Sequence, residues 1–397
     1  MISLRETIAE QVSSETAYLS ELRRWFHRHP EIAREEVLTQ AKIEEELDKL
    51  GISHCRTAGT GVLADIHGKG PGEGTVVLRA DIDALPVQEA SDVPYKSEFP
   101  GKMHACGHDA HTAALLGAAK ILSGNTDRFG GTVRLIFQPG EEVGYGGRAV
   151  IGEGRLDGAD RTFGIHLASN LPAGSVAIVP GPNNASCDWF RITVHGVGAH
   201  VSTPQDGVDA LYIASQIVVA AQALITRRTS PMDNVLIGFG RMNAGTAYNI
   251  VAPLAELEGT IRVFTPELRS QVKAELETLA KQTAAIYGGT AEIELRDYAA
   301  PLINDAGCCA EAQKTACALF GAENVVTVRE PALGADDMAD FIRCVPGCYA
   351  YIGSANPELP NTCAAHHNDH FDIDERCLTV GASLYAAYAV DFLTGAV

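Results

Sequence analysis

The sequence of 397 residues is poor in positive charge, with 31 lysines and arginines against 50 aspartates and glutamates and a net charge of -19. No cluster of basic residues offsets this excess, and a strongly acidic chain repels phosphate backbones and anionic lipid. Long hydrophobic runs are missing too. The longest, residues 212–225, spans 14 residues and contains polar side chains, whereas a membrane-spanning helix needs about 20. Neither nucleic acid nor a membrane is an expected partner.

The first residues lack the apolar segment of a secretory signal, because Arg5, Glu6 and Glu10 interrupt their hydrophobic side chains. The ten cysteines are scattered without the spacing of a disulfide framework, and the adjacent Cys308 and Cys309 cannot easily pair with each other. We therefore expect a protein of the reducing cytoplasm.

Apolar residues, by contrast, are plentiful. Hydrophobic residues make up 46% of the chain and charged residues only 20%, which is ample for a large core. Because 397 residues exceed one ordinary domain, we expect two domains.

Both ends of the chain alternate helices with short buried strands. Helical spacing of apolar residues predicts helices over 3–28, 35–50, 113–122, 310–320 and 378–393. Short apolar runs predict strands over 76–79, 133–137, 162–165 and 349–352. This alternation indicates βαβ units and an α/β fold with a mostly parallel sheet.

The middle of the chain follows a different order. It predicts a strand over 189–195, a helix over 208–226, strands over 235–240 and 257–263, a helix over 267–286 and a strand over 291–295. This is the β-α-β-β-α-β order of a ferredoxin-like unit. We therefore expect a first domain formed by residues 1–182 and 298–397, with residues 183–297 inserted as a second domain.

Three imidazoles and a thiol lie within ten residues, 103–112. Cys106 and His108 are two residues apart, and in extended backbone such side chains point the same way and can reach one metal ion. Gly107 between them would let the chain pass close to that ion. Equally, the stretch could be a helix start capped by Asp109, with Cys106 as a small buried hydrophobe.

Polar residues after the predicted strands favour the metal site. Asp81, Glu141, Glu142 and His166 each follow an apolar strand, and ligands of open parallel sheets bind at the carboxyl ends of the strands. Two adjacent carboxylates carried into the interior are costly unless a cation or a proton compensates them. One glutamate could bind metal while the other accepts a proton, although a solvated loop would also explain the pair in isolation.

Short segments covering nearly the whole chain occur in the order found in one known family. They are Arg23 with 27–31, then 78–86, 103–112, 137–142, 198–200, 249–253 and 258–262, and finally His367 with residues 371–372. Each segment is weak evidence by itself, but all of them in this order are specific. Together they resemble the M20 metallopeptidase family, in particular its subgroup of amidohydrolases that act on N-acyl amino acids, aminobenzoyl-glutamate, hippurate-like and indoleacetic-acid (auxin) conjugates.

The resemblance implies two divalent metal ions, held by Cys106, His108, Glu142, His166 and His367, with Glu141 as the general base. We prefer His367 to its neighbours His366 and His370 because it stands four residues before Phe371, and His366 remains the alternative ligand. The resemblance also implies that the inserted domain is a lid that pairs two subunits into a homodimer. In that dimer, His200 of one lid completes the site of the other subunit.

Chemistry suggests roles for four further residues. His200 is a candidate donor to the oxyanion of a tetrahedral intermediate, although it could also be an ordinary surface histidine. Asp81 is expected to orient a ligand imidazole. Arg262 offers a fork of donors for a substrate carboxylate, and Asn249 either hydrogen-bonds nearby or simply occupies a turn.

These inferences predict a dinuclear metal-dependent amidohydrolase that releases a free amino acid from an N-acyl or aroyl amino acid. Zinc or manganese is the expected metal, and cobalt or nickel also suits Cys, His and Glu ligands. A dipeptidase, or a deacetylase of an N-acetyl-diaminopimelate-type substrate, is the alternative. A catalytically silent binding protein of the same fold would lack a ligand or the base, but all six positions are filled.

Overall fold

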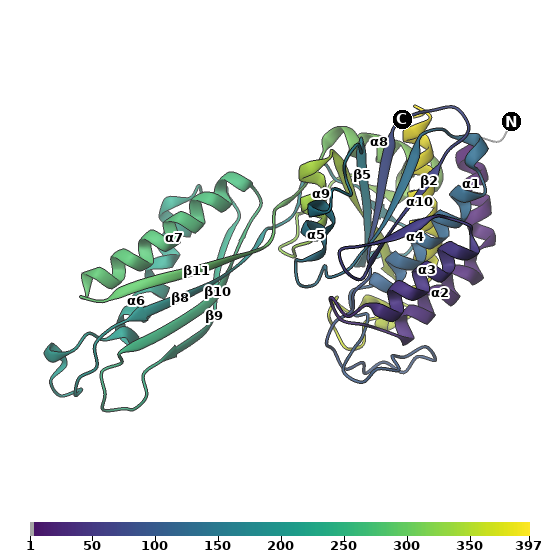
Figure 1. The fold of residues 1–397 in the computed structure, drawn as a ribbon. Coiled ribbons are helices and arrows are strands. Elements are labelled where there is room, and N and C mark those ends of the chain that lie inside the picture. Colours follow the sequence, from purple (N-terminus) through teal and green to yellow (C-terminus); the bar gives the residue numbers. More distant parts are fainter. Residues whose placement is uncertain (1–3) are drawn as a thin grey trace. The chain divides into compact units, whose positions relative to one another are not determined.

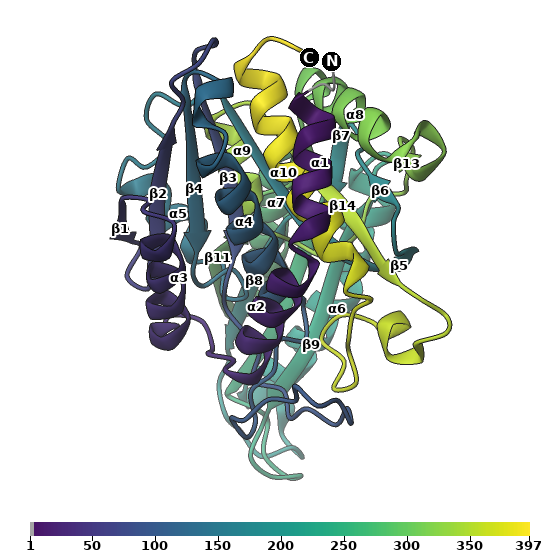
Figure 2. The same cartoon turned by 90° about the vertical axis from the view of Figure 1, so that its right-hand side faces the viewer.

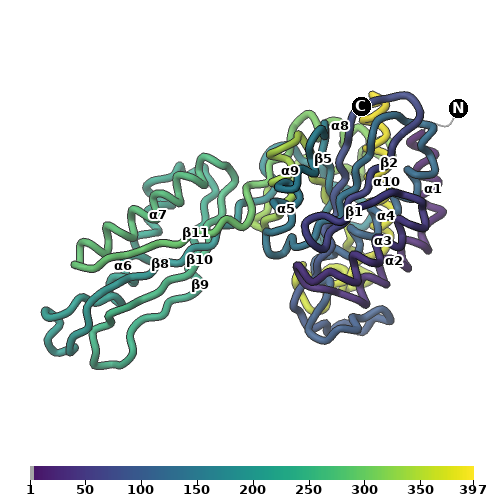
Figure 3. Tube along the Cα trace, in the orientation of Figure 1, coloured from purple at the N-terminus to yellow at the C-terminus, as the bar shows by residue number. Residues whose placement is uncertain are grey.

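The computed structural model describes residues 4–397, which form two compact units. The first unit contains the chain up to Gly181 together with Asn304–Glu330 and Asp337–Val397, and the second contains Pro182–Ile303 and Pro331–Asp336 (Figure 1). The trace in Figure 3, coloured by residue number, shows that teal and green segments from the middle of the chain build the second unit. The chain therefore passes into the second unit twice.

The first unit is built on an eight-stranded sheet in the order β1-β2-β4-β3-β5-β14-β6-β13. Its centre consists of four mutually parallel strands, which are β4 (Thr132–Gln138), β3 (Thr75–Asp81), β5 (Arg161–Pro172) and β14 (Gly347–Ala355). Their pairing confirms the predicted α/β fold with a mostly parallel sheet. Strands β1 (His54–Thr57) and β2 (Gly61–His67) extend one edge in antiparallel fashion, and the short strands β6 (Val176–Ala177) and β13 (Val325–Val326) form the other edge.

Helices cover both faces of this sheet. On one face lie α1 (Leu4–Ser14), α2 (Thr16–Arg28), α3 (Val37–Lys49), α4 (His108–Ser123), α8 (Ala306–Phe320) and α10 (Arg376–Leu393). Figure 2 views the unit from that side, and the short helices α5 (Gly146–Gly152) and α9 (Met338–Cys344) lie on the opposite face (Figure 1). Helices α4 and α10 are apolar and buried almost all round, as expected of helices in the middle of a layer.

The helix predicted over residues 3–28 is in fact two helices that meet at Glu15. The hydroxyl groups of Ser13 and Ser14 donate to the carbonyls of Ala9 and Gln11. Such side-chain bonds to the preceding turn compete with the helical ladder and often bend or end a helix.

The second unit has the predicted order of elements: β8 (Cys187–His195), α6 (Ala210–Ala223), β9 (Val235–Ala244), β10 (Leu254–Val263), α7 (Pro266–Ile286) and β11 (Thr290–Ala299). Its antiparallel sheet runs β11-β8-β10-β9, and α6 and α7 pack on one face (Figure 1). Alternate residues of β8, namely Phe190, Ile192 and Val194, are buried under these helices. This period-two burial explains why the sequence pattern identified the strand.

The second passage of the chain into this unit, Pro331–Asp336, was not predicted. Ala332 donates its backbone N–H to the Asn183 carbonyl at 2.8 Å, and its own carbonyl accepts from the Ala185 N–H at 2.9 Å. The segment thus pairs like a short strand with β7 (Gly181–Asn184). Backbone pairing of this kind leaves no pattern in the side chains.

One helical segment among the described residues, Ala210–Arg228, has the length and hydropathy of a membrane-crossing helix. A single such helix is weak evidence for a membrane span. Its inner residues, including Ile213 and Ile217, are buried against the sheet of the second unit, while Leu211, Tyr212 and Val219 are exposed. The helix is therefore apolar on the face that packs and also on the face that does not.

Candidate metal centre

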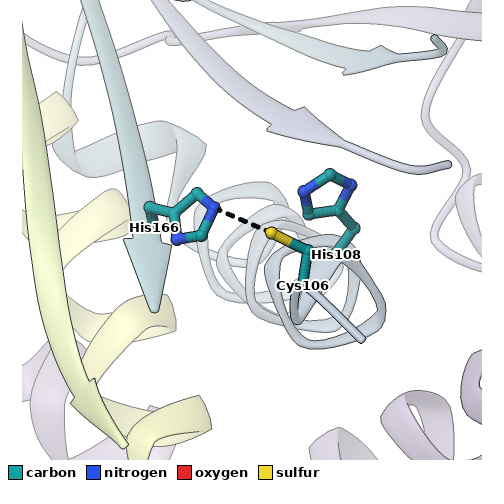
Figure 4. Close-up of side chains that lie close together, drawn as sticks. All are labelled: Cys106, His108 and His166. Atoms are coloured by element: carbon teal, nitrogen blue, oxygen red, sulfur yellow. Dashed lines mark hydrogen bonds between the residues drawn. The ribbon is translucent and has the colours of Figure 1, made fainter. Parts of the chain in front are cut away.

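Three side chains of the first unit converge where α4 meets β5. The Cys106 Sγ, a ring nitrogen of His108 and a ring nitrogen of His166 all lie within 4.8 Å of one another. His108 is the first residue of α4, Cys106 lies two residues before it, and His166 comes from β5 (Figure 4). The Cys106 Sγ and the His166 Nε2 are 3.5 Å apart.

The local backbone differs from the extended conformation predicted for residues 106–108. Helix α4 begins at His108 rather than at Ala113, and Gly107 stands before it with φ of 89° in the left-handed region. A side chain at Gly107 would also come within 3.0 Å of Leu167. A left-handed glycine turn, rather than a strand, brings Cys106 and His108 to one point. Asp109 is not the cap but a residue of the first helical turn.

Hydrogen bonds define which nitrogen each histidine presents. Nδ1 of His108 donates to the Asp83 carbonyl at 2.9 Å, and Nδ1 of His166 donates to the Leu167 carbonyl at 2.7 Å. In the neutral rings each Nε2 therefore keeps a lone pair, which is the arrangement of metal-bound histidines. The Nε2 of His108 is buried without a hydrogen-bond partner among the described residues.

The sequence predicted a strand that ends just before His166, but β5 continues past it. His166 reaches the cluster all the same. The strand continues to Pro172 alongside β14, but its pairing with β3 stops at Gly164. His166 thus lies two residues beyond the last pair with β3, so on that side it stands at the rim of the sheet.

Glu142 and His367 complete the cluster. Oε1 of Glu142 lies 3.4 Å from Nε2 of His367 and 3.9 Å from Nε2 of His108, and it has no hydrogen-bond donor among the described residues. His367 adopts a φ of 67°, unusual for a residue other than glycine, and donates its backbone N–H to the Ala105 carbonyl at 2.7 Å. That bond ties the loop carrying His367 to the residue preceding Cys106.

These residues fit divalent metal ions. Two donors that bind one tetrahedral ion at about 2.1 Å lie roughly 3.4 Å from each other, close to the separations of 3.4, 3.5 and 3.9 Å found here. The buried Nε2 of His108 and Oε1 of Glu142 both need a partner, which a cation would supply. His366 and His370 are absent from the groups that could hold an ion. His366 packs on Phe371, and His370 pairs with Asp369 in an exposed position.

Glu141 is placed by its backbone. Asp83 accepts the N–H groups of Glu141 and Glu142 with its two carboxylate oxygens at 3.1 and 3.0 Å, and Glu36 accepts the N–H of Gly140 at 2.9 Å. Three consecutive amides after β4 are thus held by two buried carboxylates. One oxygen of Glu141 lies within 4.8 Å of donor atoms of Glu142 and His108.

Asp81 is buried and hydrogen-bonds His111 rather than a predicted ligand. Its Oδ1 accepts from Nδ1 of His111 at 2.5 Å, whereas Nε2 of His108 is 3.8 Å from its other oxygen. Nε2 of His111 in turn accepts the N–H of Leu167 at 2.9 Å, so both nitrogens of His111 are engaged. Asp81 therefore orients His111, and His111 in turn holds the backbone of β5 at Leu167, the residue after His166.

Arg23, part of the resemblance described above, links two segments that carry ligands. It is fully buried, and it donates to Asp109 at 2.9 Å and to Asp372 at 2.8 Å. Asp109 follows His108 in α4, and Asp372 closes the loop that begins with His367. The ion pairs hold both segments against α2.

The charges in the cluster favour a cation. Burial, and then the neighbouring Glu142 carboxylate, raises the pKa of the Cys106 thiol. The adjacent Cys106 thiol and Glu142 carboxylate raise the pKa of His367 to about 10. Burial, followed by the positive fields of His111 and His366, lowers the pKa of His166 well below its usual value and keeps its nitrogen unprotonated. Negative charge at Cys106 and Glu142 is stabilised here only if a positive group lies beside it.

The second unit carries the other three predicted residues. His200 is exposed, and its Nδ1 accepts the N–H of Ser202 at 3.1 Å, which leaves the proton of the neutral ring on Nε2. Val201 donates to the Asn249 carbonyl at 3.1 Å, so the loops of His200 and Asn249 lie side by side. Arg262 lies near the opposite end of β10 and donates to the Leu333 carbonyl at 3.3 Å.

The position of Arg262 separates it from the other two residues. Leu254, at the start of β10, pairs with His195 close to the loops of His200 and Asn249, and Arg262 follows eight residues later. At about 3.4 Å per residue the two ends are roughly 27 Å apart. One copy of this unit cannot bring Asn249 and Arg262 to the same small substrate.

Sequence reasoning missed Asp83, Glu36 and His111 as site residues. Asp83 stands two residues after Asp81, beyond the end of the same apolar strand, and this repeated carboxylate was an available signal. Glu36 and His111 offered none, because their partners are backbone amides 104 and 56 residues away.

Known proteins share this sequence and fold. Residues 77–391 match Peptidase family M20/M25/M40. The chain is 37% identical to Thermostable carboxypeptidase 2 of Saccharolobus solfataricus over 98% of this chain and 99% of the relative, and 37% identical to N-acetylcysteine deacetylase of Bacillus subtilis over 94% and 96%. The crystal structure of Bacillus subtilis YXEP protein, described as a dinuclear metal binding peptidase from the M20 family, superposes with a TM-score of 0.84 at 34% identity, covering 96% of this chain and 99% of that one.

The match covers most of the chain, and the relatives align along nearly their whole length. The residue groups able to hold divalent metal lie on the fold that these proteins share. This chain therefore belongs to Peptidase family M20/M25/M40 and is a metal-dependent hydrolase of amide bonds.

Proposed function

We propose that the protein is an amidohydrolase that releases a free amino acid from an N-acyl or aroyl amino acid. The observation that carries the proposal is the Gly140–Glu142 loop, whose three backbone N–H groups are hydrogen-bonded to Glu36 and Asp83. The loop places the buried Glu141 beside a group of side chains able to bind metal. One carboxylate of the pair can bind metal, and the other stays available for proton transfer.

Cys106, His108, Glu142, His166 and His367 would hold two divalent ions, zinc or manganese in the first instance. When bound, such ions supply Lewis acidity, which polarises an amide carbonyl and lets water lose a proton near neutral pH. A silent binding protein is the less favoured interpretation, because the five donors and Glu141 are all in place.

Glu141 accepts the proton of the attacking water and delivers it to the nitrogen of the leaving amine, the two tasks of a general base that later acts as an acid. The N–H on Nε2 of His200 is the donor proposed for the oxyanion of the tetrahedral intermediate. A backbone hydrogen bond from Ser202 fixes the ring in the tautomer that this task needs.

Two relatives point to the substrate class. A deacetylase of N-acetylcysteine and a carboxypeptidase both cut an amide whose amine half is an amino acid with a free carboxylate. We propose the same feature in the substrate of this chain. Removal of a C-terminal amino acid from a peptide is the second candidate, favoured by the likeness to the carboxypeptidase.

A substrate panel tests the proposal. The purified protein, loaded with zinc or with manganese, is assayed against N-acetyl and N-benzoyl amino acids and N-blocked dipeptides, with released amino acid as the readout. Hydrolysis of the acyl amino acids at least about tenfold faster than the dipeptides is expected. Faster cleavage of dipeptides would favour the peptidase, and release from neither group would overturn the proposed function.

We also propose a homodimer formed through the second unit. Helix α6 exposes Leu211, Tyr212 and Val219, and β9 forms an edge of the sheet that offers unpaired backbone groups. If Asn249 and Arg262 both contact the substrate, their separation along β10 requires two copies of this unit at one site.

Sedimentation velocity measures the assembly, and a Val219→Glu variant should shift it toward monomer. Mixed dimers test the sharing of the site. A His200→Ala chain and a Glu141→Gln chain, each nearly inactive alone, should together regain up to about half of the activity per heterodimer, because one of its two sites is intact. No recovery in verified heterodimers would show that His200 serves its own subunit or has no catalytic role.

A further inference from the structure

A row of side chains crosses one face of the sheet in the first unit, starting at the metal centre. Cys106 is 3.5 Å from His166 on β5, and His166 stands directly opposite Tyr351 on β14, with 6.2 Å between the ring centres. The guanidinium carbon of Arg329, three residues after β13, lies 4.1 Å from the centre of the Tyr351 ring. Arg329 thus stands one aromatic ring away from a proposed metal ligand.

The guanidinium of Arg329 is incompletely satisfied. One of its terminal nitrogens, Nη1, is buried and has no hydrogen-bond partner among the described residues. A charged donor that has left water without finding an acceptor is costly. The Tyr351 ring covers one flat face of the guanidinium, so the N–H groups along its edge remain able to bind an acceptor.

The fully buried arginines Arg79 and Arg23 of this unit have acceptors. Arg79, next to the same site, donates to Gln138, Asp81 and Asp337 at 2.8, 2.6 and 2.7 Å. Arg23 is held by Asp109 and Asp372, and its remaining terminal nitrogen, which also lacks a hydrogen-bond partner among the described residues, lies 3.6 Å from the Glu375 carboxylate. Arg329 has no such carboxylate beside it among the described residues, so its buried nitrogen calls for an acceptor that comes from outside the chain.

We propose that Arg329 binds the free carboxylate of the amino-acid half of the substrate. The inference rests on the proposed function and identifies the group that selects acids over uncharged amides. A carboxylate matches the fork of guanidinium N–H groups and forms short, charge-assisted hydrogen bonds with it. It also needs a cation at this site, because Glu141 and Glu142 repel a second anion.

Arg262 is the rival for this role. It already donates to the Leu333 carbonyl at 3.3 Å, and it is a partly exposed residue of β10 in the second unit. The two arginines therefore make different predictions, which variants at both positions separate.

The test compares acid and amide forms of one substrate. Arg329→Met keeps a long apolar chain that can pack on Tyr351 but removes the charge, and Arg329→Lys keeps the charge without the fork. Arg262→Met tests the rival residue, and Arg343→Met, at an exposed arginine of α9 that pairs with Asp340, is the matched control. KM and kcat are measured for the best N-acyl amino acid and for its primary amide. Arg329→Met should raise KM for the acid roughly 10- to 100-fold and leave the amide within about twofold, with bound metal unchanged and a smaller defect in Arg329→Lys.

Binding is measured as well, so that the answer does not depend on turnover. Calorimetry on the Glu141→Gln protein and on its double variant with Arg329→Met should show the same acid-selective loss with N-acetylmethionine or hippurate. An equal loss for acid and amide, or an acid-selective loss in Arg262→Met alone, overturns the proposal. If the unaltered protein cleaves no acyl amino acid, the proposed function fails, and the calorimetric comparison still decides the role of Arg329.

Discussion

The metal centre of the first unit and the exposed loops of the second unit differ in how firmly the fold holds their polar side chains. His108, Glu141 and Asp81 are buried, and hydrogen bonds determine their placement. His200 and Asn249 are exposed on loops held by a few backbone bonds. A buried imidazole or carboxylate is costly unless something compensates it, so burial itself is an argument for function.

An exposed histidine carries no such cost and could stand on a surface for no reason. The difference shows that roles in the first unit can be argued from the structure of one chain, whereas roles in the second unit depend on what approaches it. Mutations should therefore affect the two regions differently. In the first unit they should disturb metal binding or proton transfer, and in the second they should leave the metal in place.

The largest effect is expected for Glu141→Gln. The amide cannot accept a proton, so kcat should fall by roughly 10⁴-fold, while metal content stays normal because Glu142 is the proposed ligand. Metal analysis and steady-state kinetics check this, with Glu142→Gln as the matched variant. If Glu141→Gln loses metal and Glu142→Gln keeps it, the two roles are reversed.

His200→Ala tests the exposed region. Loss of a donor to the oxyanion should lower kcat by roughly 10²- to 10³-fold, with metal content and thermal stability unchanged because the ring is exposed. His195→Ala, another exposed histidine of the same unit, is the control and should be near normal. Normal turnover in His200→Ala would make it an ordinary surface residue.

Cys106→Ser asks whether the thiol is a ligand or a packed apolar group. A serine hydroxyl stays protonated near neutral pH, so affinity for zinc should drop by more than about 100-fold, beyond the cost of losing an outer hydrogen-bond partner. Competition with a chelator gives the affinity, and Cys377→Ser, a buried cysteine of α10, controls for packing. Unchanged affinity would assign Cys106 to the core.

A smaller effect is expected at Asp83. Asparagine would turn an N–H group toward one of the two amides that the carboxylate now accepts, so the loop of Glu141 should shift. We expect kcat and metal affinity each to fall roughly 10- to 100-fold, the range found for outer partners of metal ligands. Asp65→Asn, which alters a partly exposed pair with Arg134, should change neither.

Much of this site was predictable because side chains carried the signal. An apolar strand that ends in Asp81 and another that is followed by Glu141 and Glu142 indicated buried carboxylates, and an alternating pattern in β8 marked the second unit. Family resemblance supplied His367, and its spacing of four residues before Phe371 favoured it over His366 and His370. Its positive φ distinguishes it in the structure.

The remainder was hidden in the backbone. Glu36 and Asp83 are site residues only because they accept amide hydrogens from Gly140–Glu142, and an amide hydrogen is the same in nearly every residue. The start of α4 at His108 depends on the left-handed turn at Gly107, where a side chain would also come within 3.0 Å of Leu167. No sequence pattern indicated a role for Arg329, because that role is inferred from a buried guanidinium nitrogen that has no hydrogen-bond partner among the described residues.

The double passage of the chain through the second unit bears on how this architecture could be shortened or recombined. Joining Gly181 to Asn304 would delete most of that unit but leave Pro331–Asp336 without its partners. The backbone hydrogen bonds of Ala332 are made to Asn183 and Ala185, which would be deleted. A clean excision would need two simultaneous cuts and two new junctions. The second unit therefore cannot be removed as one continuous segment, and a domain exchange with another protein must move both of its segments together.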